Sequence, residues 1–313
     1  MNIFIRKILL FFLLVGAILT SLGFITLQVI APQYSLGYNA AIIDKVEKLK
    51  NTTSPKIILV GNSSLAFGID SPYMEKELGY PVVNTGLYGG LKNEFAENVA
   101  KENIQPGDIV VISYITYSND SIISNPGIAW MTIENHYELW HLIDKKNYEN
   151  MLKAFPKYIL KCFRMYLTHA GNADSGDAYS RIQFNENGDN IFDRPETQLS
   201  EDYFAGADMP EIDEDSIKRI NAFNQYCLDH GATLVIAAMP IADGIYTAPK
   251  SDYESFEKEL RDKLDAPVIS NFTDYFIPYK YFFDTEYHMT NDGVRIRTEL
   301  LIKDLQKYLN NNN

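Results

Sequence analysis

The distribution of hydrophobic residues divides the chain into an apolar N-terminal segment and a longer part with an alternating pattern. No charged side chain occurs from residue 8 to residue 43, and Ile8–Ala31 is almost entirely apolar. A helix of about 20 mostly apolar residues can cross the hydrocarbon core of a bilayer. Arg6 and Lys7 precede this stretch, and no basic residue follows before Lys45. Because basic residues favour the cytoplasmic side, the pattern predicts one membrane span with a cytoplasmic N-terminus.

A cleaved signal peptide is the alternative interpretation of this segment. Signal peptides have a shorter apolar region followed by a cleavage site of small residues. Here the apolar stretch is long, and the sequence that follows, VIAPQYSLGY, offers a poor cleavage site. We therefore expect residues 1–31 to be an uncleaved signal anchor and residues 32–54 to be a linker helix. Residues 55–313 would then form a domain outside the cytoplasm.

Beyond this anchor, strand-like and helix-like patterns alternate. Continuous apolar runs are typical of buried parallel strands, and five occur: Lys56–Val60, Pro81–Asn84, Ile109–Ser113, Thr233–Met239 and Pro267–Ser270. Helical patterns lie around them, at residues 35–50, 72–78, 92–102, 215–230, 253–264 and 292–309. Alternating strands and helices predict an α/β fold with a parallel sheet of about five strands between two layers of helices.

One insertion, at about residues 121–209, interrupts the alternation. Its first part is rich in aromatic residues at helical spacing, and its second part, Tyr179–Asp193, resembles a hairpin that turns at Gly188-Asp189. Because it follows the third strand, the insertion is expected near the carboxyl edge of the sheet, where it could serve as a lid or a partner surface.

Charge excludes one large class of functions. The 313 residues include 28 Lys and Arg but 41 Asp and Glu, which gives a net charge of −13. Nucleic-acid binding needs a basic face, so we do not expect it here. Residues 44–313 contain all 41 acidic residues and 26 of the basic ones. From this balance, the part outside the membrane is not expected to bind anionic lipid.

Cysteine and histidine point to no metal or disulfide framework. Cys162 and Cys227 are the only cysteines, and we expect two partly buried thiols, although a pair in an oxidising compartment stays open. His136 and His141 are five residues apart and would not share a helix face, so a metal site is not expected.

Polar residues that could do chemistry follow the predicted strands. Ser63 follows the first strand, Gly86 the second and Asn119 the third, while Asp284 and His288 come after the fifth. Ligands bind beyond the carboxyl ends of such strands. A serine, backbone and amide donors, and a carboxylate–histidine pair are the parts needed for acyl transfer. Taken alone, Ser63 could be a helix cap and His288 a surface residue; their combination in this order favours a site.

Three segments resemble the sequence blocks of a known enzyme family. Ile58–Asp70 resembles its first block, with Ser63 as the nucleophile, and Val83–Gly86 resembles its second, with the Gly86 N–H as an oxyanion donor. Phe282–His288, followed by Gly293 and Arg297-Thr298, resembles its last block. The family is the SGNH/GDSL hydrolase superfamily. The likeness is greatest to its membrane-anchored bacterial surface members, such as the teichoic-acid D-alanyl transfer protein and exopolysaccharide O-acetyltransferases.

This resemblance covers about residues 55–310 and implies a flavodoxin-like sheet and a serine-dependent reaction. Ser63, His288 and Asp284 would form the catalytic triad, and Ser63, Gly86 and Asn119 the oxyanion hole. The implied activity is O-acyl ester hydrolysis or O-acyl transfer outside the membrane, on a cell-surface glycan or a teichoic-acid-type polymer, with no cofactor. The alternative is a catalytically degenerate accessory or glycan-binding protein that partners a multi-pass membrane acyltransferase.

Two departures from the family pattern leave residue roles open. The third block usually contains Gly-x-Asn-Asp, but the nearest match here is Tyr117-Ser118-Asn119-Asp120, which lacks the glycine. The last block usually has Asp three residues before His. Here Asp284 is four residues before His288, and Glu286 is two before it. Either carboxylate could orient the imidazole; we favour Asp284, because the apolar residues before it would anchor it.

Overall fold

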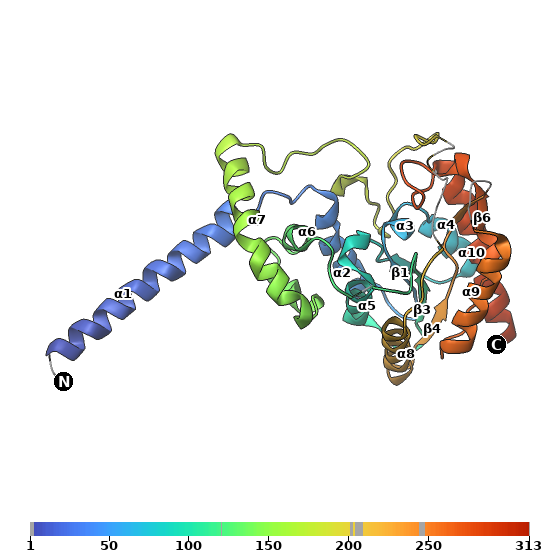
Figure 1. Ribbon diagram of the computed structural model, residues 1–313, viewed down its shortest axis with the longest axis horizontal. Helices are drawn as coiled ribbons and strands as arrows, with labels where there is room; N and C mark the ends of the chain where they lie inside the picture. The colour runs from blue at the N-terminus through green and yellow to red at the C-terminus, as the bar shows by residue number, and fades with distance from the viewer. Residues whose placement is uncertain (1–2, 120, 201–202, 204–208, 244–247, 313) are drawn as a thin grey trace.

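A computed structural model describes residues 3–119, 121–200, 203, 209–243 and 248–312. Helix α1 (Ile3–Ile25) extends away from the rest of the molecule and continues through a π-helical turn, Thr26–Ile30 (Figure 1). None of the residues of α1 is buried against the protein. From Ile3 to Ile30 the helix is long and apolar enough to span a membrane. These features are consistent with the single-pass anchor that the sequence predicts.

The remaining chain folds around a parallel sheet of four strands in the order β2-β1-β3-β4. The register sets Ile57 opposite Val82 on one side and Ile109 on the other. The strand order reverses between β1 and β3, which is where sheets of this kind bind ligands. The strands are β1 (Ile57–Gly61), β2 (Val82–Asn84), β3 (Ile109–Ser113) and β4 (Thr233–Ile236).

The predicted fifth strand is reduced to a single bridge. Residues 267–270 lie beside β4, where Val268 forms an isolated parallel bridge with Ile236. Pro267 has no N–H to donate to a ladder, and the chain enters a 3-10 helix at Phe272. The expectation of five strands is therefore wrong for the described residues. A separate pair of short parallel strands, β5 (Ile241–Asp243) and β6 (Phe276–Pro278), was not predicted.

Helices cover both faces of the sheet, because successive residues of each strand point to opposite sides. Ile58 and Val60 pack against one helical layer, whereas Ile57 and Leu59 pack against the other. The first layer contains α2 (Ile42–Asn51), α5 (Asn93–Ala100), α8 (Glu214–Asp229) and α9 (Lys250–Lys263). The second contains α3 (Ser63–Ala66), α4 (Ser71–Leu78) and α10 (Asn291–Asn312). The expected linker helix is thus α2, which is packed into the domain through the buried Leu49.

The insertion builds a second, aromatic core around α6 (Pro126–Thr132) and α7 (Tyr148–Thr168). Trp130 stacks on Tyr158 with ring centroids 5.9 Å apart, and its Nε1 donates to the Met151 carbonyl at 2.8 Å. Cys162 is buried in this core and Cys227 in the core under the sheet, and both thiols are free. Burial raises the pKa of Cys162 to about 11 and that of Cys227 to about 12.

The hairpin predicted in the second half of the insertion is present only at its turn. Gly188 adopts φ 93°, in the left-handed region that glycine tolerates. Phe184 and Asn190 form one antiparallel bridge across this turn. The rest of this segment forms no strand among the described residues.

Candidate active site

His288 and Asp284 form the centre of the site. His288 Nδ1 lies 2.8 Å from Asp284 Oδ1, and only 6 % of the His288 side chain and 18 % of the Asp284 side chain is exposed. The loop between them is closed by the Phe283 N–H, which donates to the His288 carbonyl at 2.7 Å. A bridge between Phe282 and Met289 closes it from outside. This closure explains why a carboxylate four residues before the histidine can reach its ring.

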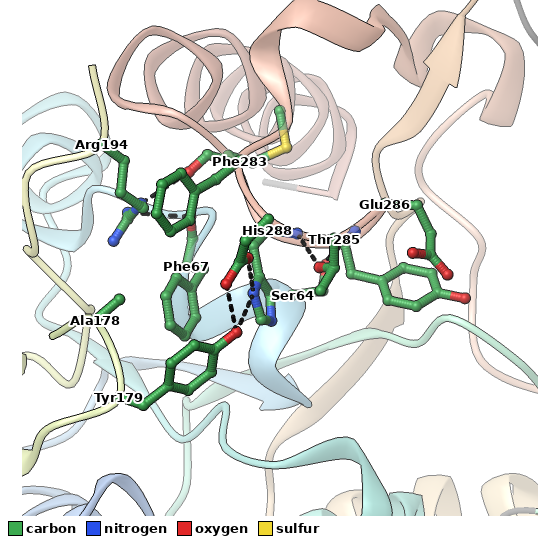
Figure 2. Close-up of polar contacts among 12 residues, drawn as sticks. Ser64, Phe67, Ala178, Tyr179, Arg194, Phe283, Thr285, Glu286 and His288 are labelled. Atoms are coloured by element: carbon green, nitrogen blue, oxygen red, sulfur yellow. Dashed lines mark hydrogen bonds and ion pairs between the residues drawn. The ribbon is translucent and has the colours of Figure 1, made fainter. Parts of the chain in front are cut away.

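Tyr179, from the insertion, is the third member of this group (Figure 2). Its hydroxyl donates to Asp284 Oδ2 at 2.6 Å and lies 3.3 Å from His288 Nδ1. Burial opposes the charge of Asp284, but hydrogen bonds from His288 and Tyr179 hold the pKa of the carboxyl below its ordinary value. Burial and the neighbouring Asp284 raise the pKa of Tyr179. The carboxylate therefore stays charged while the phenol stays neutral.

The contact with Asp284 leaves the other imidazole nitrogen available. A carboxylate at Nδ1 favours the tautomer with its proton on Nδ1, so that Nε2 carries a lone pair. Within the described part of the chain, Nε2 has no hydrogen-bond partner. The ring is also fixed from its face, because Phe67 stacks on it with centroids 4.1 Å apart and planes 12° apart. Asp284 and Phe67 thus fix both the edge and the face of the His288 ring.

Ser63 is the first residue of α3, directly after β1. The Asn62 side chain caps this helix by accepting from the Ser64 N–H at 2.9 Å. Ser63 is half-buried, and its hydroxyl makes no hydrogen bond to a described residue, His288 included. The Phe67 N–H donates to the Ser63 carbonyl at 2.9 Å, and the Phe67 ring stacks on His288. Ser63 thus begins the short helical turn whose C-cap residue, Phe67, contacts the imidazole.

The neighbouring serine, Ser64, has a structural position instead. It is fully buried, and its Oγ accepts a hydrogen bond from Arg297 Nη1 at 3.0 Å. The guanidinium of Arg297 also reaches the Ser64 carbonyl and Ser113 Oγ. Burial lowers the pKa of Arg297 to about 9. Arg297, which the sequence indicates only as part of the last block, thus holds α3 against α10.

Gly86 does not have the contact that the resemblance implies. Its N–H donates to Asn84 Oδ1 at 3.0 Å and is therefore not free for an oxyanion in this structure. A Cβ at this position would lie 2.6 Å from the Asn62 carbonyl oxygen, so glycine is needed for the close approach to α3. The Ser63 N–H remains as a donor, because the first N–H groups of a helix have no intrahelical partner.

Asn119 and Glu286, the two residues with open roles, are directed elsewhere. Asn119 has φ 46°, and its N–H donates to Asp213 Oδ2 at 2.8 Å. Its side chain lines a polar surface hollow that includes neither Ser63 nor His288. Asp120 lies outside the described residues. Glu286 accepts from the Tyr203 hydroxyl at 2.7 Å and points away from His288 (Figure 2). The preference for Asp284 over Glu286 agrees with these contacts.

Two buried residues of the insertion support the site, and no pattern in the sequence indicates them. Arg194 is 2 % exposed, donates to the Met289 carbonyl at 2.8 Å, and lies 5.0 Å from the centre of the Phe67 ring. Asp189 accepts from Asn84 Nδ2 at 2.8 Å and from Ser71 Oγ at 2.7 Å, and burial raises the pKa of its carboxyl. The insertion is therefore part of the site.

Comparison with known proteins adds no relative: no family model matches the chain, and no curated protein or solved structure matches it. Among the described residues, no group of three or more His, Cys, Asp and Glu side chains is arranged to hold a metal ion.

Proposed function

We propose that this protein is a membrane-anchored, serine-dependent O-acyl esterase or O-acyltransferase that acts outside the cytoplasm. The observation that carries the proposal is the oriented His288, held by Asp284 at Nδ1 and by Phe67 on its face, while its Nε2 has no hydrogen-bond partner among the described residues. A half-buried serine begins the helical turn that contacts the same imidazole. Nucleophile, base and orienting carboxylate are the parts of the acyl-transfer triad.

In the proposed reaction, Ser63 Oγ attacks the acyl carbonyl carbon while its proton moves to His288 Nε2. Asp284 stabilises the imidazolium that forms, and the Ser63 N–H donates to the oxyanion. The tetrahedral intermediate collapses when its C–O bond to the leaving alcohol breaks, and His288 gives its proton to that alcohol. Water or a sugar hydroxyl then attacks the acyl-serine while His288 accepts its proton. The bond between the acyl carbon and Ser63 Oγ breaks, and His288 returns the proton to Ser63 Oγ.

The proposed substrate is a surface glycan or a teichoic-acid-type polymer, in keeping with the resemblance to bacterial surface enzymes. Arg6 and Lys7 before the apolar helix support a cytoplasmic N-terminus and a catalytic domain outside. A multi-pass membrane acyltransferase that supplies the acyl group would be a fitting partner for such an anchored domain.

Covalent labelling with a fluorescent fluorophosphonate tests the proposal, and the adjacent serines provide a matched control. We expect the wild-type protein and the Ser64→Ala variant to be labelled, and the Ser63→Ala variant to remain unlabelled. Circular dichroism establishes that each variant is folded. No labelling of a folded wild-type protein, or equal labelling of Ser63→Ala, would contradict the enzyme and favour a non-catalytic accessory protein.

A further inference from the structure

Helix α7 carries an apolar face that the described part of the chain leaves exposed. Five large side chains on it are exposed, with Leu152 at 65 %, Leu160 at 51 % and Leu167 at 61 %, together with Phe163 and Tyr166. At 3.6 residues per turn, all five fall within an arc of about 120° of the helix surface. The buried residues of the helix, Met151, Tyr158 and Cys162, fall outside this arc. We call these five residues the apolar arc of α7.

A basic stripe lies next to the apolar arc. Four cationic residues occupy the neighbouring side of α7, whereas Glu149 is its only acidic residue. The charge of this helix is therefore opposite in sign to the net charge of −13 of the whole chain. The four residues, all exposed, are Lys153, Lys157, Lys161 and Arg164. An exposed apolar arc beside a basic stripe is typical of helices that lie at a membrane surface.

The position of α7 relative to α1 gives this face a neighbour. α7 packs against the Thr26–Ile30 turn and runs across the end of α1 (Figure 1). The Tyr137 hydroxyl donates to the Leu27 carbonyl at 3.1 Å. An open apolar hollow of about 320 Å³ lies at this junction, lined by Leu27, Trp130, Tyr137, Trp140, Leu152 and Phe155.

The length of α1 places the same junction at the edge of a bilayer. The uncharged part of the helix begins at Ile8, directly after Arg6 and Lys7. From Ile8 to Leu27 the helix rises about 30 Å, at about 1.5 Å per residue. This length matches the hydrocarbon core, so the hydrocarbon would end at Leu27. Tyr and Trp gather at membrane–water interfaces, and aromatic residues surround Leu27 here.

We propose that α7 lies in the interface of the leaflet from which α1 emerges. Its apolar arc would enter the boundary between headgroups and acyl chains, and its basic stripe would contact anionic headgroups. The proposal rests on α1 crossing a bilayer and not on the acyl chemistry. It also revises the expectation from net charge, because binding to anionic lipid depends on the local charge of α7.

Two leucines of similar exposure allow a matched test in the full-length protein. Leu160 is on α7, whereas Leu228, at 53 % exposure, is on α8, which lies farther from α1 (Figure 1). Leu160→Cys and Leu228→Cys are each labelled with the fluorophore NBD and reconstituted into vesicles that contain phosphatidylglycerol. Because Cys162 and Cys227 are buried, the wild-type protein gives the labelling background.

The readout is quenching of NBD by a lipid with a shallow spin label. For a helix buried about 5–10 Å into the interface, quenching at residue 160 should exceed about half of the emission, while residue 228 is unaffected. Equal emission and quenching at both positions would overturn the proposal. A blue-shifted label at residue 160 without quenching would also overturn it, because a second copy or another protein would then cover the face. The quenching does not depend on catalysis. A protein whose Ser63 is not labelled by the fluorophosphonate should therefore give the same quenching at residue 160.

Discussion

The pairing of His288 with Asp284, and not with Glu286, leads to a sharp prediction about activity. The substitution Asp284→Asn keeps the size of the side chain but removes the charge that faces Nδ1 at 2.8 Å. Glu286→Gln makes the same chemical change two residues away, on a side chain bonded to Tyr203. The two variants therefore differ mainly in whether the altered group contacts the imidazole.

The magnitude follows from the interaction that each substitution removes. A hydrogen bond to a charged group contributes about 1.5–3 kcal/mol, and about 1.4 kcal/mol corresponds to tenfold in rate. Removal of the Asp284 charge should therefore lower kcat/KM by about 10- to 150-fold. An amide can also hold the wrong tautomer of the imidazole, which raises the reduction toward about 10⁴-fold, as in serine-protease triads. Glu286→Gln should cost less than about fivefold, the effect of a surface interaction of about 1 kcal/mol.

The assay is hydrolysis of 4-nitrophenyl acetate by the full-length protein in detergent, with kcat/KM measured for both variants and the wild type. Melting temperatures establish that each protein is folded under the assay conditions. A reduction for Glu286→Gln that equals or exceeds the reduction for Asp284→Asn would refute the assignment. An unchanged rate for Asp284→Asn would refute the role of the carboxylate altogether.

Three further predictions concern the remaining parts of the molecule. The low pKa of Asp284 contributes stability that is fully present above the unfolded pKa and is lost as the pH falls through the folded pKa; Tyr179→Phe removes a donor and brings the folded pKa closer to the unfolded one, so the melting temperature of this variant should fall less on acidification than that of the wild type. Tyr203→Phe, whose hydroxyl donates to Glu286, should keep the pH dependence of the wild type. Asn119→Ala should lower esterase activity by less than about tenfold, since a true oxyanion donor contributes about 100- to 1,000-fold; a reduction of about 1,000-fold in a folded variant would contradict this. The full-length protein should stay in the membrane fraction after carbonate washing, and recovery of a soluble form beginning near Gln33 would show cleavage instead.

The sheet could be predicted where burial alone determines the pattern. Both faces of β1 and β3 are covered by helices, so their sequences are continuous apolar runs and their positions were predicted within one residue. The run at residues 267–270 has a similar pattern but forms only one bridge. Apolar character reports burial, whereas strand formation also needs backbone donors, and Pro267 supplies none. The pattern could not distinguish these cases.

Within the candidate site, the sequence was informative where the interacting residues are close along the chain. Asp284 and His288 belong to one short loop, and their spacing identified them together. Tyr179 comes from a segment more than a hundred residues earlier, and no periodicity or motif indicates that its hydroxyl reaches Asp284. The sequence placed Gly86 after the second strand and the resemblance implied its role, but glycine shows only that a backbone approaches closely. The acceptor of its N–H, Asn84, is defined by the folded turn.

The segment that carries Tyr179 links the site to the membrane end of the molecule. It begins directly after α7, and the Asn172 N–H donates to the Gln33 carbonyl at 2.8 Å, just beyond the end of α1. Further along, the Tyr38 N–H donates to the Tyr179 carbonyl at 3.0 Å. The residue that orients Asp284 is thus fixed to the stretch of chain by which α1 enters the domain. If α7 rests on the same leaflet, then α1, α7 and the segment that carries Tyr179 together hold the pair of His288 and Asp284 at a constant height above the bilayer. A constant height would suit the proposed substrate, which is itself attached to the cell surface.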